Sequence, residues 1–174
     1  MDRKKKAPRE SFVSMTELVL PNDTNTLNNL MGGRLMHWMD VVSAIAGQKH
    51  CNSIVVTASV DNISFRSPIQ LGNVVTLKAR ATRAFNSSVE IRIDVEAENI
   101  PEGKKVASHS AYFTFVAVDH DGKPVPIPEV VPETEEEQQL YDGALRRRQL
   151  RLILSGRMKP SEANELKSLF DIKR

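Results

Sequence analysis

The chain has 174 residues, of which 40% are hydrophobic, 26% charged and 5% aromatic. This composition is typical of one globular domain and excludes a collagen-like or disulfide-stapled chain. The 24 Lys and Arg residues against 22 Asp and Glu give a formal charge of +2, which is too small and too evenly mixed to indicate nucleic-acid binding.

Residues 1–10 are charged and aperiodic, which predicts a disordered leader. They lack the apolar stretch of a signal peptide, and no run in the chain approaches the roughly 20 apolar residues of a membrane helix. Cys51 is the one cysteine of the sequence, so no internal disulfide is possible and a reducing compartment is expected. We therefore expect a cytoplasmic protein without a membrane or nucleic-acid partner.

A short edge strand is predicted from Phe12 to Leu20, ending at Pro21. After a loop rich in Asn and Thr, residues 34–47 are apolar at nearly every helical angle. This pattern predicts a helix that is buried on most sides and ends at Gly47.

Residues 89–98 alternate between apolar and charged side chains, which predicts a strand with one wet face. Short connections predict that strands adjacent in sequence pair antiparallel. One buried helix followed by such strands predicts an α+β fold in which the sheet curls around the helix, the architecture called a hotdog. Exposed strand edges and a remaining apolar flank predict at least a dimer. The weaker strands are 54–65, 74–81 and 106–119, and the connections are 67–72, 84–87 and 101–104.

Beyond the last strand, residues 119–123 predict a turn, and four prolines between 124 and 132 predict a stiff connector. We place the hotdog domain at 11–128 and a helical extension at 129–174. Within the extension, residues 133–151 are acidic first and basic last, an order that complements a helix dipole. Ser161 is a candidate cap for a last short helix carrying Leu166, Leu169 and Phe170. The basic run Arg146–Arg148, without interleaved aromatics, is interpreted as a solvated helix face.

Asp40 lies in the most apolar segment of the chain, where an unpaired carboxylate is costly to bury. Such an environment favours a general base that orients and deprotonates a water molecule. The alternative is a carboxylate on the solvated edge of the helix, or one paired with Arg34 or His37.

Gly32 and Gly33 stand at the predicted start of the helix, where unpaired backbone N–H groups can meet an oxyanion without a Cβ in the way. The alternative is a flexible hinge. Asn29, three residues earlier, is a candidate to hold a water or a substrate carbonyl, or is a turn residue. Ser87 and Ser88 have no evident His partner, so a serine nucleophile is not expected.

The segment from Leu20 to Asp40, with its Gly-Gly and Met-Asp pairs, resembles the cytosolic acyl-coenzyme A hydrolases, which are hotdog thioesterases. The resemblance covers about residues 12–128. It implies hydrolysis of acyl-CoA by water to a free acid and coenzyme A, without a covalent intermediate, metal or redox cofactor. The other matching positions are Val56, Thr57, Phe65, Pro68, Gly72 to Val75 and Phe115 to Asp119.

This resemblance also implies roles for individual residues. Asp40 matches the acidic catalytic position, Asn29 the position facing it across a dimer, and Gly33 the backbone donor to the thioester carbonyl. The site would thus be built from two protomers, and relatives commonly assemble as trimers of dimers. Candidate substrate-binding residues are Gly32, Thr57, Arg66, Arg83, Ser87, Ser88, Lys104 and Lys105.

The sequence departs from the family at several positions. Asn28 and Asn62 replace frequent glycines, Asn73 replaces the usual Asp, and Arg66 stands one residue earlier than the basic residue of many relatives. Two other functions stay open. One is an acyl-CoA-sensing binding module, and the other is a hotdog dehydratase, for which His37 would have to be recruited as the proton-transfer group.

Overall fold

The computed structural model describes residues 3–61, 63 and 67–168. Their contacts divide the chain into two compact units, with the boundary between Val131 and Pro132. The first unit contains two β-sheets and one long helix, and the second contains helices α2 and α3.

The main sheet of the first unit has five strands, and every neighbouring pair is antiparallel. In β5 the apolar residues from Val89 to Ala97 are fully buried and the intervening charged residues lie on the other face, as predicted. That face is not wet throughout, because Glu90 is also fully buried and accepts from the Thr82 hydroxyl at 2.6 Å. In spatial order the strands are β2 (Val13–Leu18), β4 (Val74–Ala84), β5 (Ser88–Asn99), β6 (Lys104–Val118) and β3 (Ile54–Asp61).

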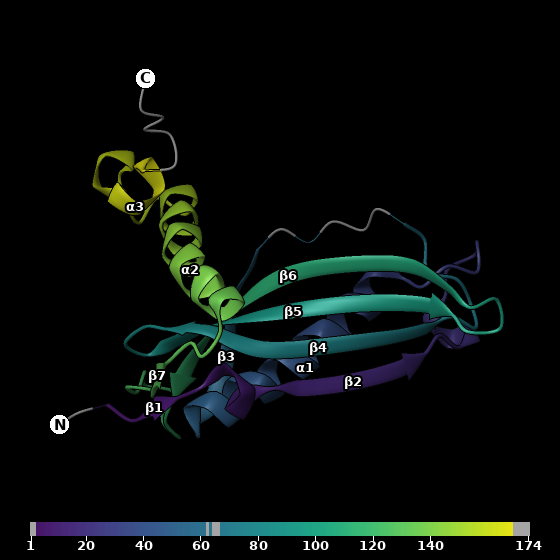
Figure 1. The fold of residues 1–174 in the computed structure, drawn as a ribbon, viewed down its shortest axis with the longest axis horizontal. Coiled ribbons are helices and arrows are strands. Elements are labelled where there is room, and N and C mark those ends of the chain that lie inside the picture. Colours follow the sequence, from purple (N-terminus) through teal and green to yellow (C-terminus); the bar gives the residue numbers. More distant parts are fainter. Residues whose placement is uncertain (1–2, 62, 64–66, 169–174) are drawn as a thin grey trace. The chain divides into compact units, whose positions relative to one another are not determined.

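Helix α1 (Gly32–Cys51) crosses one face of this sheet and contacts all five strands (Figure 1). Its buried side chains recur every three or four residues, as a helix with one face on a sheet requires. The predicted hotdog fold and the edge position of β2 are therefore confirmed. The buried apolar residues of α1 are Leu35, Trp38, Met39, Val42, Ala46 and Cys51.

Two details of the predicted helix are wrong. Gly47 does not end α1, because the helix continues over the sheet for one more turn to Cys51. The end is set by Asn52, which adopts a left-handed conformation with φ of 51°. The helix is also not buried on most sides of this chain, since Met36 and Ile45 are 39% and 43% exposed. The apolar outer side of α1 thus remains uncovered in one chain.

The connection between β3 and β4 also differs from the prediction, because these strands are not neighbours. β4, β5 and β6 form two consecutive hairpins, and β3 pairs with the remaining edge of β6. The segment from Ser67 to Gly72 therefore belongs to a crossing between distant strands rather than to a hairpin. β3 is left as an edge strand, with Ile54 and Val56 45% and 49% exposed.

The prediction of a disordered leader is wrong for the described residues that begin at Arg3. β1 (Lys5–Lys6) pairs in parallel with β7 (Glu129–Val130), and the 3₁₀-helix η1 (Pro8–Ser11) follows. Arg3 donates from Nε to the carbonyl of Ile127 at 2.8 Å, and the buried Ser11 hydroxyl accepts from the N–H of Ala81 at 2.9 Å. Arg3 thus donates to a carbonyl of the proline-rich segment, and the carbonyls of Lys4 and Lys6 accept from the N–H groups of Glu129 and Val131. A sequence pattern does not reveal such backbone partners.

In the second unit, α2 (Glu135–Leu154) begins with a capping box. The Thr134 hydroxyl accepts from the N–H of Glu137, and the Glu137 carboxylate accepts from the N–H of Thr134, each at 3.2 Å. The helix predicted from the acidic-to-basic order of residues 133–151 is therefore confirmed. Ser161 lies inside η3 (Pro160–Glu162) rather than capping α3 (Asn164–Lys167), while Leu169 and Phe170 lie outside the described residues. Within the described ranges, the helices are all too short or too polar to cross a membrane.

Candidate active site

Asp40 is half-buried at the margin of the apolar face of α1, next to the buried Met39. Its Oδ1 accepts a hydrogen bond of 2.9 Å from the hydroxyl of Thr57 on β3. Neither alternative ion pair forms, since Arg34 pairs with Asp23 at 3.0 Å and His37 is exposed without a polar partner among the described residues. The carboxylate is thus fixed through one oxygen and reachable from outside.

The position of Thr57 depends on an irregularity in β3. Thr57 lies opposite Phe115 of β6, and the pairing register then shifts between Thr57 and Ser59. Residues directly opposite each other share a face, and the Phe115 ring faces α1 at the level of Gly47. Thr57 therefore points toward the helix, and the bulge that follows is a device that often re-aims side chains beside active sites.

The start of α1 presents two backbone donors. The N–H groups of Arg34 and Leu35 both donate to the carbonyl of Met31, at 3.0 and 3.1 Å. The N–H groups of Gly32 and Gly33 have no acceptor within the described part of the chain. A Cβ added at Gly33 would meet nothing within 4 Å, so the space beside this residue is open. The positive end of the helix dipole adds to the attraction for an oxyanion here.

The loop before α1 is held by the side chain of Asn25. Its Oδ1 accepts from the N–H groups of Leu27 at 2.9 Å and Asn29 at 3.2 Å. Asn29 is half-buried and forms an isolated bridge with Gln70, and its side-chain amide has no partner among the described residues. Asn28 has a φ of 57°, a left-handed conformation that asparagine tolerates, which fits a position where relatives often have glycine.

Asp23 is a residue of this region that the sequence analysis did not single out. Its buried carboxylate accepts from the N–H of Leu20 at 3.0 Å and pairs with Arg34 at 3.0 Å, while its carbonyl accepts from the N–H of Met31. It thereby ties the loop to the start of the helix. Only half of a capping box forms, because Leu20 has no side-chain acceptor, and the usual sequence signal of such a cap is therefore missing here.

The candidate substrate-binding residues do not form one group within the chain. Ser88 starts β5 next to Val89, and Val89 lies on the same cross-strand row as Phe115 and Thr57. Because Val89 faces α1, Ser88 points to the outer face.

Lys104 and Lys105 lie at the other end of β5, roughly 36 Å away at about 3.3 Å per residue. They pair with Glu102 at 3.1 Å and Glu96 at 3.7 Å. At the first end, Arg83 lies over the Phe85 ring at 5.8 Å, close in sequence to Ser87, whose carbonyl accepts from Ala117. Within one chain, these candidates therefore form two groups at opposite ends of β5.

Other sequence candidates have simpler outcomes. Arg66 and Asn62 lie outside the described residues. Asn73 is buried and its Oδ1 accepts from the N–H of Gln70 at 2.9 Å, so the asparagine that replaces the usual Asp holds a turn. Over the described ranges, no group of three or more His, Cys, Asp or Glu residues is arranged to hold a metal ion.

Comparison with known proteins agrees with this architecture. The Thioesterase superfamily model matches residues 27–104. An uncharacterized acyl-CoA thioester hydrolase of Bacillus subtilis, YkhA, is 42% identical over 80% of this chain and 81% of its own length. The cytosolic acyl coenzyme A thioester hydrolase of Rattus norvegicus is 37% identical over 84% of this chain, which spans 39% of the rat protein.

Solved structures give the same result. An apo-hexameric acyl-CoA thioesterase superposes with a TM-score of 0.83 at 36% identity, covering 87% of this chain and 97% of that one. An acyl-CoA hydrolase of Staphylococcus aureus in complex with butyryl coenzyme A and coenzyme A has a TM-score of 0.78 at 36% identity, covering 87% and 94%. The chain therefore belongs to the Thioesterase superfamily, within the group of acyl-CoA thioester hydrolases of the hotdog fold.

Proposed function

We propose that this protein hydrolyses acyl-CoA thioesters with a water molecule that Asp40 activates. The observation that carries the proposal is the 2.9 Å hydrogen bond from the Thr57 hydroxyl to Asp40 Oδ1, beside an open helix start. Thr57 was a candidate substrate-binding residue, and its contact with Asp40 supports a positioning role instead. It leaves Oδ2 of Asp40 without a partner among the described residues and ready to accept a proton.

The chemistry follows from these groups. Asp40 takes a proton from water as the water oxygen attacks the thioester carbonyl, and the negative charge collects on the carbonyl oxygen. The N–H of Gly33, with that of Gly32, donates to this oxyanion. The tetrahedral intermediate then collapses, the C–S bond breaks, and the proton that Asp40 took from water passes to the departing sulfur, so that coenzyme A leaves as the thiol and Asp40 is again ionised. This route needs no metal, redox cofactor or covalent enzyme intermediate.

Structures of the Staphylococcus aureus enzyme with single alanine replacements support the assignment. One replaces an Asp, another a Thr, and the two positions lie 17 residues apart, as Asp40 and Thr57 do. A third replaces an Asn that lies 15 residues before that Asp, where this chain has Asn25. The spacing therefore favours Asn25 over Asn29 as the asparagine of the site.

The remaining elements of the proposal concern assembly and location. The uncovered outer side of α1 and the apolar edge strand β3 support a homodimer in which the asparagine loop of one chain meets Asp40 of its partner. The hexameric relatives support a trimer of such dimers. The relatives named cytosolic support a cytoplasmic location. The thioesterase domain, placed at residues 11–128 from the sequence, is assigned to the whole first unit, which includes β1 and ends at Val131.

The alternative functions have less support. A dehydratase would need a His beside the catalytic carboxylate, and His37 is exposed while the Asp40 carboxylate is held by Thr57. A sensor module would bind acyl-CoA without turnover. Steady-state hydrolysis of short, medium and long acyl-CoA substrates separates these cases and identifies the preferred chain length.

The shared site is tested by mixing inactive subunits. Asp40→Asn chains are exchanged with Asn25→Ala chains, and in a parallel experiment with Asn29→Ala chains. If the site is built from two protomers, the mixed dimer contains one intact site and recovers up to half of the activity per dimer. Recovery in neither mixture, with subunit exchange verified, would contradict a shared site. Full activity of either Asn variant alone would remove that residue from the site.

A further inference from the structure

Three short turns among the described residues share one arrangement, in which an acidic side chain caps a 3₁₀-helix that begins with proline. In each turn, the carboxylate accepts a hydrogen bond from the N–H of the residue three positions earlier. The acidic residues are Glu10 in η1, Asp23 in η2 (Pro21–Asp23) and Glu162 in η3. Glu10 and Glu162 are exposed, whereas Asp23 is only 6% exposed. The burial of Asp23 therefore has a cause other than the cap that all three turns share.

Asp23 is buried because it joins three parts of the chain. Its Oδ2 accepts from the N–H of Leu20, and its Oδ1 lies 3.0 Å from Nε of Arg34 in the first turn of α1. Its backbone carbonyl accepts at 2.9 Å from the N–H of Met31, the residue that precedes α1. Among the described residues, the Asp23–Arg34 pair is the one side-chain bond between this loop and α1. The two ends of the loop and the start of the helix therefore meet at Asp23.

The asparagine loop, residues 24–30, is closed on itself between these contacts. Asn25 donates its N–H to the carbonyl of Asn29 at 2.9 Å, and Thr24 forms an isolated antiparallel bridge with Leu30. Backbone hydrogen bonds also join the far side of the loop to residues 69–71. The loop is therefore a rigid part that carries both candidate asparagines of the site, and its base is where it is joined to the helix start.

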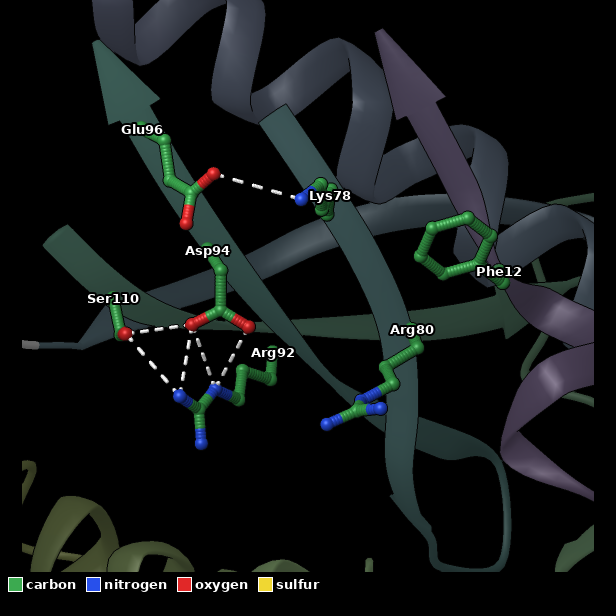
Figure 2. A pocket seen from close by; sticks show the side chains of 7 residues that line it. All are labelled: Phe12, Lys78, Arg80, Arg92, Asp94, Glu96 and Ser110. Atoms are coloured by element: carbon green, nitrogen blue, oxygen red, sulfur yellow. Dashed lines mark hydrogen bonds and ion pairs between the residues drawn. The ribbon is translucent and has the colours of Figure 1, made fainter. Parts of the chain in front are cut away.

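A second Asp–Arg pair in the first unit shows what distinguishes the pair at Asp23. Figure 2 shows Asp94 bonded to Arg92 and to the Ser110 hydroxyl, on the face of the sheet away from α1. Nε of Arg92 lies 2.9 Å from Oδ1 of Asp94, a distance similar to that at Asp23. Arg92 and Asp94 are two residues apart on β5, and Ser110 lies opposite Asp94 on β6. Because the backbone of the sheet already fixes these positions, this pair joins no separate parts of the chain.

Loss of the Asp23–Arg34 pair has two physical consequences at the start of α1. A buried carboxylate without its cation is uncompensated, and its charge opposes the negative charge that collects on the thioester oxygen. The loop and the first turn of the helix also lose the bond that fixes them to each other, and a misplacement of about 1 Å in a catalytic group can lower the rate about 100-fold. Both consequences act on the transition state more than on substrate binding.

We propose that Asp23 is a positioning residue of the thioesterase reaction, acting through its ion pair with Arg34. The inference rests on the proposed function. The pair holds the asparagine loop and the amides of Gly32 and Gly33 in one arrangement, and it neutralises the carboxylate beside them. Asp23 does not touch the substrate, so kcat depends on the pair more strongly than KM does.

The test compares Asp23→Asn with two matched control variants, by steady-state hydrolysis and urea unfolding. Asp23→Asn keeps the size of the side chain and an acceptor for the N–H of Leu20 but removes the charge that holds Arg34. We expect kcat to fall about 10- to 100-fold, while KM changes by less than about twofold. Asp94→Asn controls for the loss of an Asp–Arg pair and Glu10→Gln for the loss of a turn cap. Both controls are expected to keep the kcat of the unmodified protein.

Variants of Arg34 test whether the effect passes through this contact. Arg34→Met removes the cation and should lower kcat as much as Asp23→Asn does, whereas Arg34→Lys keeps a cation and should retain most of the rate. Combining Asp23→Asn with Arg34→Met should lower kcat no further than either change alone, because both remove the same interaction. Additive losses in the double variant would overturn the assignment to the ion pair.

Hydrogen exchange of residues 24–35 gives a readout that does not depend on activity. Exchange of these amides is expected to be faster in Asp23→Asn and unchanged in Asp94→Asn. If the unmodified protein hydrolyses acyl-CoA and folded Asp23→Asn keeps its kcat, or loses no more of it than Glu10→Gln, this inference alone is overturned. An unmodified protein that hydrolyses no acyl-CoA would overturn the proposed function, and this inference with it.

Discussion

The two ends of α1 differ in how far their polar groups are satisfied. At the start, the N–H groups of Gly32 and Gly33 have no acceptor in the described chain and Asp40 is half-buried. At the other end, His50 is fully buried, with its Nε2 2.9 Å from the carbonyl of Pro128. Nearby, Lys6 donates to the carbonyl of Lys49 at 2.7 Å.

This difference indicates which end of α1 bonds its polar groups within the chain and which end leaves them accessible to a ligand. Helix termini leave backbone groups that side chains, water or ligands must satisfy. The end near His50 takes partners for His50 Nε2 and the Lys49 carbonyl from within the chain, although His50 Nδ1 is buried without one among the described residues, and its contacts contribute to stability. The end near Gly33 keeps donors and a carboxylate accessible, as a binding or catalytic site requires. Substitutions at the two ends should therefore affect different measurements, activity at one and stability at the other.

The largest effect is expected at Asp40. Asp40→Asn keeps the shape of the side chain and its contact with Thr57 but removes the proton acceptor. We expect kcat to fall by about 10² to 10⁴, with little change in acyl-CoA affinity or in the free energy of unfolding. Steady-state hydrolysis and calorimetric binding measure both quantities. Wild-type turnover by the folded variant would rule out Asp40 as the base.

Gly33→Ala should separate catalytic activity from stability at a single position. The new Cβ meets nothing within 4 Å of the chain, so the fold tolerates it. Because Gly33 is only the second residue of α1, Ala is expected to stabilise the helix by at most roughly 0.5–1 kcal/mol relative to Gly. If the thioester oxygen approaches the Gly33 N–H, the same methyl group obstructs it and activity falls by about 100-fold. Urea unfolding and hydrolysis rates test both directions. A variant that is more stable and fully active would show that no ligand approaches this amide closely.

Much of the Gly33 end of α1 was predictable from sequence, because the signals there come from residues that are close together in the chain. Gly32 and Gly33 next to an apolar helix, and Asp40 within it, are visible as a pattern, as is the alternation of β5. The Asp40–Thr57 contact was not predictable, since it depends on β3 pairing with β6 and on the bulge after Thr57. The separation of Lys104 from Ser88 likewise follows from the strand topology.

The end near His50 was the less predictable one. Arg3, Lys6 and His50 all use backbone carbonyls as partners, namely those of Ile127, Lys49 and Pro128. Every residue carries a carbonyl, so sequence does not show which one is chosen. A basic, aperiodic leader therefore has the same sequence pattern whether it is disordered or anchored as it is here.

Thr57→Val tests the fixing of Asp40 with a smaller expected loss. Val replaces the hydroxyl by a methyl group at nearly constant shape, so the carboxylate loses its one protein partner among the described residues. We expect kcat to fall about tenfold, which corresponds to roughly 1.4 kcal/mol, with little change in KM. Thr57→Ser retains the hydroxyl and should restore most of the rate. Equal losses in both variants would indicate that the packing of Thr57 matters rather than its hydrogen bond.

The smallest effect is expected at the other end of the helix, as a dependence of stability on pH. Burial lowers the pKa of His50 below its ordinary value of 6.5, opposed by the bond to Pro128 and by Glu10, and assisted by Lys6 and Arg3. Its Nδ1 is buried without a partner among the described residues, so a second ring proton has no acceptor there. The unfolded chain therefore binds the proton more readily than the folded one.

The sign of the pH effect follows from this difference in proton binding. His50 costs nothing above about pH 6.5, and below it the free energy of unfolding falls by at most about 1.4 kcal/mol per pH unit until the folded pKa is reached. His50→Gln keeps a donor for the Pro128 carbonyl and does not titrate, so urea unfolding of both proteins between pH 7.5 and 5 isolates the His50 contribution. Hydrolysis measured where both remain folded should differ little between them, because His50 lies ten residues beyond Asp40, about 15 Å along the axis of α1. Parallel stability curves for the two proteins would show that His50 carries no proton-linked stability, and a large difference in rate would show that the two ends are coupled.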